Sequence, residues 1–189
     1  MNIGKTLYVT NRRDWRAWLK KNHATKSDIW LVYYKKESGK PRIPYNDAVE
    51  EALCFGWIDS ILKKIDTNRF TQRFSPRKPK SQLSAMNRER VKRLIKAKKM
   101  TSAGLDAIKH RFHPRYVEKD RRFVIPASIR VALMKDERTW KNFKKFPESY
   151  KRIRVWWIAA ARHRPEIYKQ RLRYFLKMTA QNKKFGMVQ

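Results

Sequence analysis

The sequence predicts an α+β protein, with a small mixed or antiparallel sheet, helices packed on that sheet, and a helical C-terminal segment. Two observations predict this class. Strand-like and helix-like patterns alternate over the first part of the chain, whereas only helical spacing of apolar residues is found after Pro126. We therefore expect an α+β domain over residues 1–111, a linker over residues 112–126 and a helical domain over residues 127–189.

The composition is that of a folded, strongly basic protein. Hydrophobic residues make up 41% of the 189 residues and aromatic residues 13%, which is too much for a disordered chain. The 48 Lys and Arg against 16 Asp and Glu give a formal charge of +32, which favours an anionic partner, nucleic acid first of all. A general bias toward basic residues explains the same excess, because the charge is spread over most of the chain.

The sequence contains no targeting or membrane-spanning pattern. Its first residues, MNIGKTLYVTNRRDW, lack the apolar run of a signal peptide. No apolar segment approaches the length of a membrane span. We therefore expect a cytoplasmic protein.

Three elements are predicted before the central stretch of the chain. Residues 6–10 form a short strand, and Asn11 caps a helix over residues 12–22. Residues 28–36, DIWLVYYKK, are β-branched and aromatic on both faces, which predicts a central strand. Residues 37–41 form the turn that follows it.

The central stretch, residues 45–81, begins with a helix. Its sequence is YNDAVEEALCFGWIDSILKKIDTNRFTQRFSPRKPKS. Val49, Leu53 and Trp57 recur at intervals of four, which predicts a buried helical stripe. Asn46 is placed to cap this helix.

Two strands follow this helix and form a hairpin. After Gly56 the period changes to two, which predicts a strand over residues 57–66 and a second strand over residues 69–75. Regular alternation in the first strand would place on one face Ile58, Ser60 and Leu62, and on the other Trp57, Asp59 and Ile61. The residues between the strands, Asp66 to Asn68, are of types that favour a turn.

The rest of the chain is predicted to be helical. Ser84 caps a basic helix that reaches about residue 99, and Thr101 caps a short helix that reaches about residue 109. Three or four helices follow the linker. They are marked by Ile129 and Leu133, by Trp140 and Phe143, by Tyr150, Ile153, Trp157, Ile158 and Ala161 after Pro147, and by Tyr168, Leu172, Phe175, Leu176 and Thr179.

Several long motifs resemble a known family. DAVEEALCFGWIDS, QRFSPRKPKS and RVKRLI with MTSAGLDAI are similar to the YdeI/OmpD-associated (OmdA) family of bacteriocin-protection proteins. The resemblance is dense over residues 15–108 and thinner over residues 126–172. It implies an OmdA-like helical C-terminal domain and a link to the cell envelope and to tolerance of antimicrobial peptides. It implies no particular reaction.

The strand hairpin contains the candidate ligand site. Asp59 is flanked by apolar residues on its strand and needs a partner, which Arg69 or Arg73 would supply across the hairpin. One interpretation is a buried ion pair that fixes the strand register. The other is an anion-binding pocket in which Trp57 forms a wall, Asp59 orients the two arginines and Arg77 completes the site.

The basic loop and helix after the hairpin give a second hypothesis, sequence-independent nucleic-acid binding. Residues 76–100 contain ten Lys and Arg and one acid, Glu89, a local charge of +9. The predicted contacts to the nucleic-acid backbone are Arg77, Lys78, Lys80, Arg88, Lys92 and Lys96. We refer to these six residues as the basic strip.

A third hypothesis is an enzyme that acts on a small acidic substrate, with Glu50 or Glu51 as a second carboxylate beside Asp59. No residue is assigned a catalytic role, because the sequence contains no GxGxxG or phosphate-binding loop and its single cysteine is expected in the core. His110 and His113 are expected to be a solvated pair rather than metal ligands. We therefore predict no cofactor and no metal.

Overall fold

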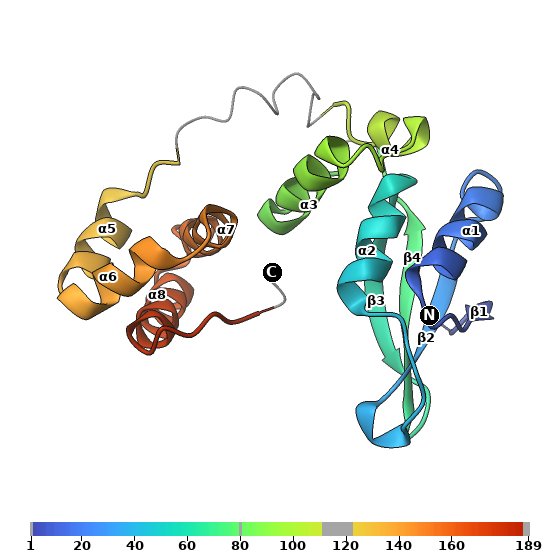
Figure 1. Cartoon of the computed structure of the whole chain (residues 1–189), viewed down its shortest axis with the longest axis horizontal. Coiled ribbons are helices and arrows are strands. Elements are labelled where there is room, and N and C mark those ends of the chain that lie inside the picture. The colour runs from blue at the N-terminus through green and yellow to red at the C-terminus, as the bar shows by residue number, and fades with distance from the viewer. Residues whose placement is uncertain (1, 80, 111–122, 187–189) are drawn as a thin grey trace. The chain divides into compact units, whose positions relative to one another are not determined.

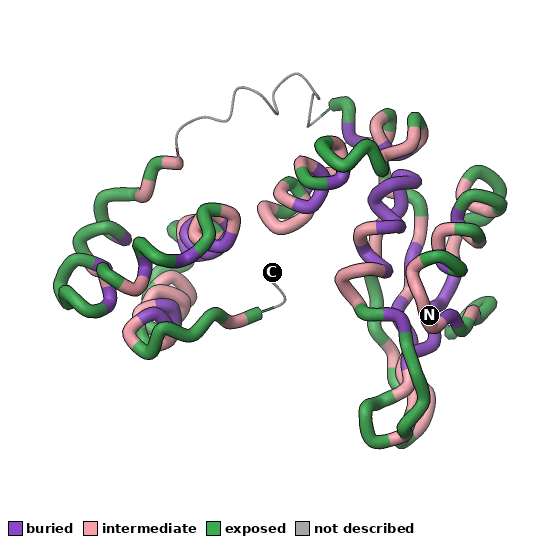
Figure 2. The backbone as a smooth tube through the Cα atoms, in the orientation of Figure 1, coloured by how far each residue is buried: buried purple, intermediate pink, exposed green. Residues whose placement is uncertain are grey.

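The computed structural model describes residues 2–79, 81–110 and 123–186, which form two compact units (Figure 1). Among these residues, the first unit comprises residues up to 83 together with residues 90–110. The second unit comprises residues 84–89 and 123–186. Each unit has its own buried core, as Figure 2 shows.

The element order confirms the predicted α+β class with a helical C-terminal region. The elements up to residue 110 are β1 (Thr6–Leu7), α1 (Arg12–Asn22), β2 (Ile29–Tyr34), the 3-10 helix η1 (Lys36–Ser38), α2 (Tyr45–Cys54), β3 (Trp57–Lys64), β4 (Arg69–Pro76), α3 (Ala85–Lys96) and α4 (Ser102–Asp106). The later ones are α5 (Ala127–Met134), α6 (Glu137–Lys145), α7 (Glu148–Ala159) and α8 (Pro165–Ala180). The four C-terminal helices contain the predicted apolar markers except Ala161, which follows α7.

The sheet is mixed, with the strand order β1-β2-β4-β3. β1 pairs with β2 in parallel, and the other two pairings are antiparallel. β2 lies between β1 and β4 and is buried along most of its length, as its β-branched and aromatic residues predicted. β1 is shorter than predicted, because the main chain after it turns away and the Val9 carbonyl accepts a hydrogen bond from the Ile43 amide.

β3 contains a bulge that changes the predicted alternation. Asp59 lies opposite Phe74 and Leu62 lies opposite Gln72, so two residues of β3 oppose Arg73 alone. Leu62 therefore lies on the same face as Asp59, and the prediction that they occupy opposite faces is wrong. The extra residue was invisible in the sequence because it depends on pairing with β4.

The core of the first unit lies between the sheet and helices α1 and α2 (Figures 1 and 2). Trp15 and Leu19 of α1 and Leu53 of α2 are fully buried against Leu31 of β2 and Phe74 of β4. The Trp15 indole donates a hydrogen bond of 2.9 Å to the carbonyl of Ala48, so this large ring is buried with its polar atom satisfied.

The beginning of α2 differs from the prediction. Pro44, not Asn46, occupies the N-cap position. The Asn46 side chain instead accepts a hydrogen bond of 2.6 Å from Arg90, which is itself buried. Cys54, near the end of the helix, is fully buried as expected, and burial raises the pKa of its thiol to about 11.

The carboxylates of α2 are held by arginines from α1 and α3. Glu51 is only 2% exposed and accepts hydrogen bonds from both Arg12 and Arg16 of α1, the latter at 2.6 Å. Glu50 accepts bonds of 2.8 Å from Arg12 and 2.7 Å from Arg93. These ion pairs with arginines of two other helices give both glutamates a structural role.

The second unit is a bundle of helices around an aromatic core. Leu133 of α5, Phe143 of α6, Ile158 of α7 and Phe175 of α8 are buried together. Asp136 caps α6 by accepting a 2.7 Å hydrogen bond from an amide of its first turn. Among the helices that the structure describes, none is both long enough and apolar enough to cross a membrane.

Candidate functional site

The predicted hairpin residues are close in the sheet but have partners other than those expected. Asp59 accepts a hydrogen bond of 2.6 Å from the Tyr45 hydroxyl of α2. This bond and burial raise the pKa of Tyr45, with burial the larger cause. The predicted ion pair between Asp59 and Arg69 or Arg73 is therefore wrong.

Both hairpin arginines form ion pairs with other acids. Arg69 binds Asp66 at 2.7 Å, three residues earlier in the chain. Arg73 binds Asp28 at 2.7 Å, at the start of β2. The two guanidinium groups are thus already neutralised by acids of the same unit.

Trp57 and Arg77 complete the predicted hairpin set. Trp57 is buried, and its indole donates a hydrogen bond of 3.1 Å to the carbonyl of His23. Arg77 donates from Nη2 to the Ser81 hydroxyl and the Gln82 carbonyl, each at 3.0 Å. The Arg77 Nε is buried and has no hydrogen-bond partner among the described residues. Burial lowers the pKa of the Arg77 guanidinium.

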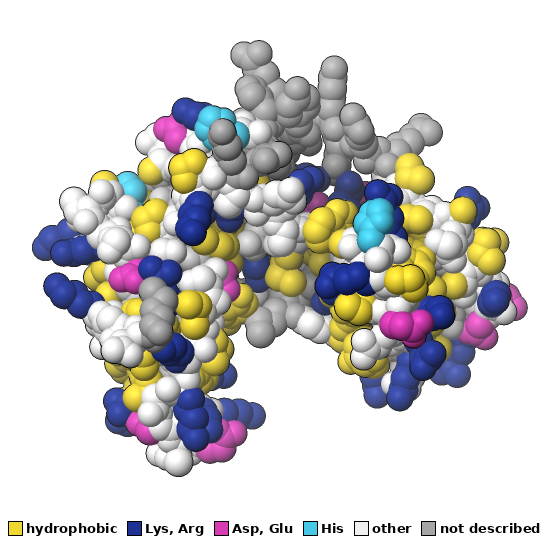
Figure 3. Space-filling view, turned by 180° about the vertical axis from the view of Figure 1, so that it is seen from behind, with side chains coloured by type: hydrophobic (Ala, Val, Ile, Leu, Met, Phe, Trp, Pro, Cys, Tyr) yellow, Lys and Arg dark blue, Asp and Glu magenta, His cyan; other side chains and the backbone are white. Residues whose placement is uncertain are grey.

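The basic strip is partly exposed. Lys78, Arg88 and Lys96 are exposed and Lys92 is half-buried, while Lys80 lies outside the described residues. Lys and Arg side chains are also spread widely over the visible face of both units (Figure 3). The strip is therefore one of many positively charged parts of the surface.

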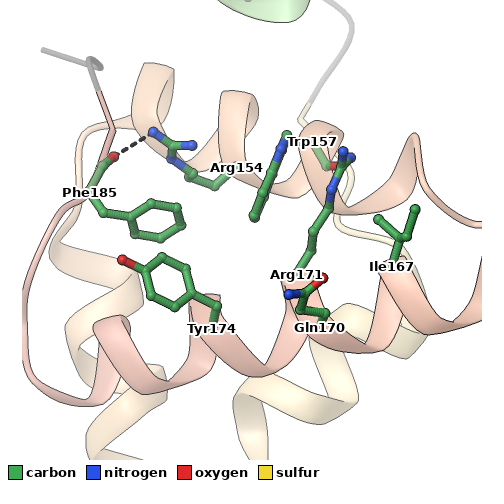
Figure 4. A pocket seen from close by; sticks show the side chains of 7 residues that line it. All are labelled: Arg154, Trp157, Ile167, Gln170, Arg171, Tyr174 and Phe185. Carbon is green, nitrogen blue, oxygen red and sulfur yellow. Dashed lines mark hydrogen bonds between the residues drawn. The ribbon is translucent and has the colours of Figure 1, made fainter.

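A pocket of about 580 Å³ lies in the second unit, between α7, α8 and the segment that follows α8 (Figure 4). Its lining residues are Arg154, Trp157, Ile167, Gln170, Arg171, Tyr174 and Phe185. These residues combine two guanidinium groups, three aromatic rings and one amide, and they include no Asp or Glu. We call this the Arg–aromatic pocket.

Arg154 of α7 is the most buried charge of the pocket. It is 6% exposed, and its Nη2 donates a hydrogen bond of 2.5 Å to the carbonyl of Phe185. Its guanidinium carbon lies 4.2 Å from the centre of the Phe185 ring. Its Nε has no partner among the residues that the structure describes, and burial lowers the pKa of the guanidinium. Thus this cation is held by rings and a carbonyl rather than by an acid.

Arg171 of α8 is held in a similar way. Its Nη1 donates a hydrogen bond of 2.6 Å to the carbonyl of Trp157, and its guanidinium carbon lies 4.7 Å from the Trp157 ring. Arg154 lies 5.9 Å from the same indole, so Trp157 lies between two guanidinium groups, as Figure 4 shows. Stacking of this kind fixes a guanidinium plane without neutralising its charge.

This pocket was not predicted from the sequence, although the spacing of its α8 residues is visible there. Residues 167, 170, 171 and 174 recur at helical intervals and lie on one face of α8. Trp157 was predicted as part of a buried stripe, and it does pack against the core while it also lines the pocket. Predicting the pocket would have required knowing which faces of α7 and α8 are not covered by other helices.

The electrostatic field around the pocket is positive. Residues 123–186 contain seventeen Lys and Arg against four Asp and Glu, which leaves a formal charge of +13. Within the described part of the chain, no group of three or more His, Cys, Asp or Glu is placed to hold a metal ion. His113 lies outside the described residues.

Comparison with protein families gives two matches along the chain. Residues 7–107, more than half of the chain, match the model described as "Domain of unknown function (DUF8412)". The chain belongs to the DUF8412 family. Residues 122–182 match the model described as "Bacteriocin-protection, YdeI or OmpD-Associated" (OmdA). No curated protein and no solved structure matches the chain.

The matches confirm the resemblance to OmdA proteins and divide the DUF8412 chain into two parts. The OmdA domain includes helices α5 to α8 and every pocket residue except Phe185. The motifs over residues 15–108, where the resemblance is denser, coincide with the DUF8412 match. The Arg–aromatic pocket is therefore a feature of the OmdA domain and the segment that follows it.

Proposed function

We propose that this protein is a non-enzymatic binding protein whose OmdA domain takes an anionic ligand in the Arg–aromatic pocket. One observation carries the proposal: Arg154 and Arg171 line the same pocket, and neither forms an ion pair with an acid of the described chain. A buried cation that lacks a counter-charge is costly, because burial removes its hydration. An anionic ligand would supply that counter-charge.

The lining residues support binding rather than catalysis. They include no His, Cys, Ser, Asp or Glu, the side chains that most often act as nucleophiles or general bases. Trp157, Ile167 and Phe185 offer apolar surface for the rest of the ligand. The volume of about 580 Å³ is that of a site for a small organic molecule. The ligand that fits best therefore has an anionic group attached to a flat apolar body.

The biological setting is part of the same proposal. The OmdA description names bacteriocin protection, and we propose that ligand binding contributes to tolerance of antimicrobial peptides or to the response to envelope stress. We further propose a cytoplasmic location, so the link to the envelope would be regulatory.

A simple pair of probes tests the pocket. The protein, labelled with ¹⁵N, is titrated with naphthalene-2-sulfonate and, separately, with the neutral naphthalene-2-methanol, and the indole N–H signal of Trp157 is followed by NMR. We expect saturable binding of the sulfonate and at least about 10-fold weaker binding of the alcohol, because a hydrogen bond to a charged group contributes about 1.5–3 kcal/mol.

A matched pair of variants tests whether Arg171 provides the positive charge that binds the sulfonate. Arg171→Met should weaken sulfonate binding about 10-fold or more, whereas Lys169→Met, an exposed α8 residue that is paired with Glu166, should leave it unchanged. Equal binding of the two probes, or equal losses in the two variants, would contradict the proposal.

A second anion site at the hairpin stays a prediction, with Arg77 as its best-supported member. Trp57, Asp59, Arg69 and Arg73 have the partners described above, whereas the buried Arg77 Nε has none among the described residues. Titration of the Arg77→Met variant with inorganic phosphate tests the site. Phosphate shifts of the amides around residue 77 should disappear in the variant. Shifts that persist would show that Arg77 is not a ligand.

Nucleic-acid binding through the basic strip is the second candidate function, and the exposure of Lys78, Arg88 and Lys96 favours it. Its contacts would be to phosphates, so binding should be independent of sequence and steeply weakened by salt. The triple variant Arg88→Gln, Lys92→Gln, Lys96→Gln should flatten the salt dependence by about three phosphate contacts. An unchanged slope would leave the strip as a solvated surface.

A further inference from the structure

We infer that the Arg–aromatic pocket binds a nucleobase together with its attached phosphate, from a free nucleotide or from single-stranded nucleic acid. This inference rests on the proposed function, because it names the chemical class of the anionic ligand of the same pocket. It differs from binding by the basic strip, which involves phosphates alone.

Flat surfaces dominate the pocket. Tyr174 is 45% exposed, and its ring meets the Phe185 ring edge-to-face with the ring centres 4.7 Å apart. The Arg171 guanidinium lies over the Trp157 ring and presents a second flat group. Unpaired bases are bound by stacking on aromatic rings and on guanidinium planes, so the pocket offers both kinds of surface that a base requires.

One polar side chain is placed to contact the edge of a base. The Gln170 amide carries both a donor and an acceptor, and it forms no hydrogen bond with a described residue. The Tyr174 hydroxyl points away from Gln170 (Figure 4), so Tyr174 contributes its ring. In Figure 4 the Gln170 amide lies next to Arg171, on the same face of α8. A donor and acceptor beside flat surfaces is the arrangement that recognises the hydrogen-bonding edge of a base.

The phosphate would be bound by charge rather than by a glycine-rich loop. Arg171 uses one N–H group on the Trp157 carbonyl, and its guanidinium has five N–H donors in total. The formal charge of +13 over residues 123–186 attracts a phosphate to this part of the chain. The pocket thus has separate features for the two parts of a nucleotide.

An acidic peptide fits the pocket less well. The walls are formed largely by helices α7 and α8, and the Trp157 carbonyl near the end of α7 is already bound by Arg171. An extended peptide would find no exposed strand edge with which to pair its own amides and carbonyls. The base of a nucleotide needs no such edge.

Two oligomers with the same number of phosphates test the inference. Fluorescein-labelled dT₁₂ and a 12-mer of abasic sites are titrated with the full-length protein at about 150 mM salt, and anisotropy is measured. If the base stacks in the pocket, dT₁₂ should bind about 10-fold tighter or more, since one stacked base contributes about 1–3 kcal/mol. Competition by thymidine monophosphate distinguishes the sources, because a strand should exceed the mononucleotide in affinity only if neighbouring phosphates also bind.

Two exposed aromatic residues give a matched pair of variants. Tyr174→Leu removes the ring from the pocket, and Trp156→Leu removes a ring of α7 that is 47% exposed and does not line the pocket. Tyr174→Leu should weaken dT₁₂ binding about 5-fold or more without changing the abasic affinity. Trp156→Leu should change neither.

The outcomes separate this inference from the proposed function. Equal affinity for dT₁₂ and the abasic 12-mer, or equal losses in the two variants, would overturn the nucleobase inference. If naphthalene-2-sulfonate still binds in that case, the anion pocket stands and an acidic peptide becomes the next ligand to test. If neither the oligomers nor the sulfonate bind, both proposals fail.

Discussion

Two pairs of arginines, one pair in each unit, are held in opposite ways. In the first unit, Arg12 and Arg16 donate to the buried Glu51, so each charge has a counter-charge of the same chain. In the second unit, Arg154 and Arg171 are held by aromatic rings and main-chain carbonyls. Both arrangements orient a guanidinium group, but only the second leaves its positive charge for a ligand.

This difference distinguishes arginines that are neutralised within the chain from arginines that are not, which their number alone does not do. The chain has 48 Lys and Arg, and a count gives no reason to prefer one cluster over another. A guanidinium saturated by carboxylates gains little from a further anion. A guanidinium satisfied by neutral acceptors keeps its attraction for one.

The network of the first unit should be the more sensitive to loss of an arginine. Arg12→Met would leave Glu51, which is 2% exposed, with Arg16 alone, and we expect a loss of about 3 kcal/mol in the free energy of unfolding. Hydrogen exchange of the β2 amides measures this loss in the first unit. Arg13→Met is the control, because that side chain is 91% exposed and should cost less than about 0.5 kcal/mol. Similar losses in both variants would remove the structural role from Arg12.

Acid should weaken the same network. Burial alone would raise the pKa of Glu50, but hydrogen bonds from Arg12 and Arg93 hold it below its ordinary value. A lowered pKa in the folded state contributes stability above the unfolded value of about 4.3, and this stability is lost as the pH falls through the folded value. Glu50→Gln should therefore reduce the loss of first-unit stability measured between pH 6 and about pH 2. Glu166→Gln, an exposed acid of α8, should not.

Adding one methyl group at Gly186 should loosen the packing of the segment that follows α8. Gly186 has a φ of 72°, and a Cβ there would lie 2.2 Å from Arg154 Nη2. Gly186→Ala should therefore cost about 1 kcal/mol through backbone strain, and more if Arg154 does not move. The expected readout is faster exchange of the Phe185 amide, which donates to the Tyr150 hydroxyl at 3.3 Å. Unchanged exchange would show that the segment tolerates the methyl group.

The smallest effect on stability is expected at Arg154. Arg154→Met removes a hydrogen bond and a ring contact, but it also removes a buried charge that has no acid partner among the described residues. These changes oppose each other, and we expect a net change within about 1 kcal/mol, with loss of sulfonate binding. Thermal unfolding and the NMR titration measure the two quantities. A loss as large as that of Arg12→Met would show that Arg154 is structural.

Helices, strands and caps were predicted from the sequence more accurately than the partners of the charged side chains. Helix α1 and the caps Asn11 and Thr101 follow from local spacing and side-chain chemistry, and the structure confirms them. The pairing of Arg69 with Asp66 is equally local, but strand pairing alone predicted a partner across the hairpin, which was wrong. Arg73 pairs with Asp28, 45 residues earlier, and no local pattern indicates this.

The candidate pocket was predictable only in part. The row formed by Ile167, Gln170, Arg171 and Tyr174 is a helical stripe of mixed character, which a search for purely apolar stripes passes over. Its partner residues on α7 and the position of Phe185 depend on how the chain packs after α8. Such packing is decided by the whole core and not by any one segment.

The bulge of β3 has a consequence for the behaviour of the protein in concentrated solution. β3 and β1 are the two edges of the sheet. β1 has only two residues, and β3 is bent at the bulge and ends in Lys63 and Lys64. Long, flat, apolar edges are the templates on which sheets add to one another and grow into fibrils. The bulge and the two lysines interrupt the β3 edge beside the exposed Ile61 and Leu62, so they should disfavour edge-to-edge aggregation of the first unit.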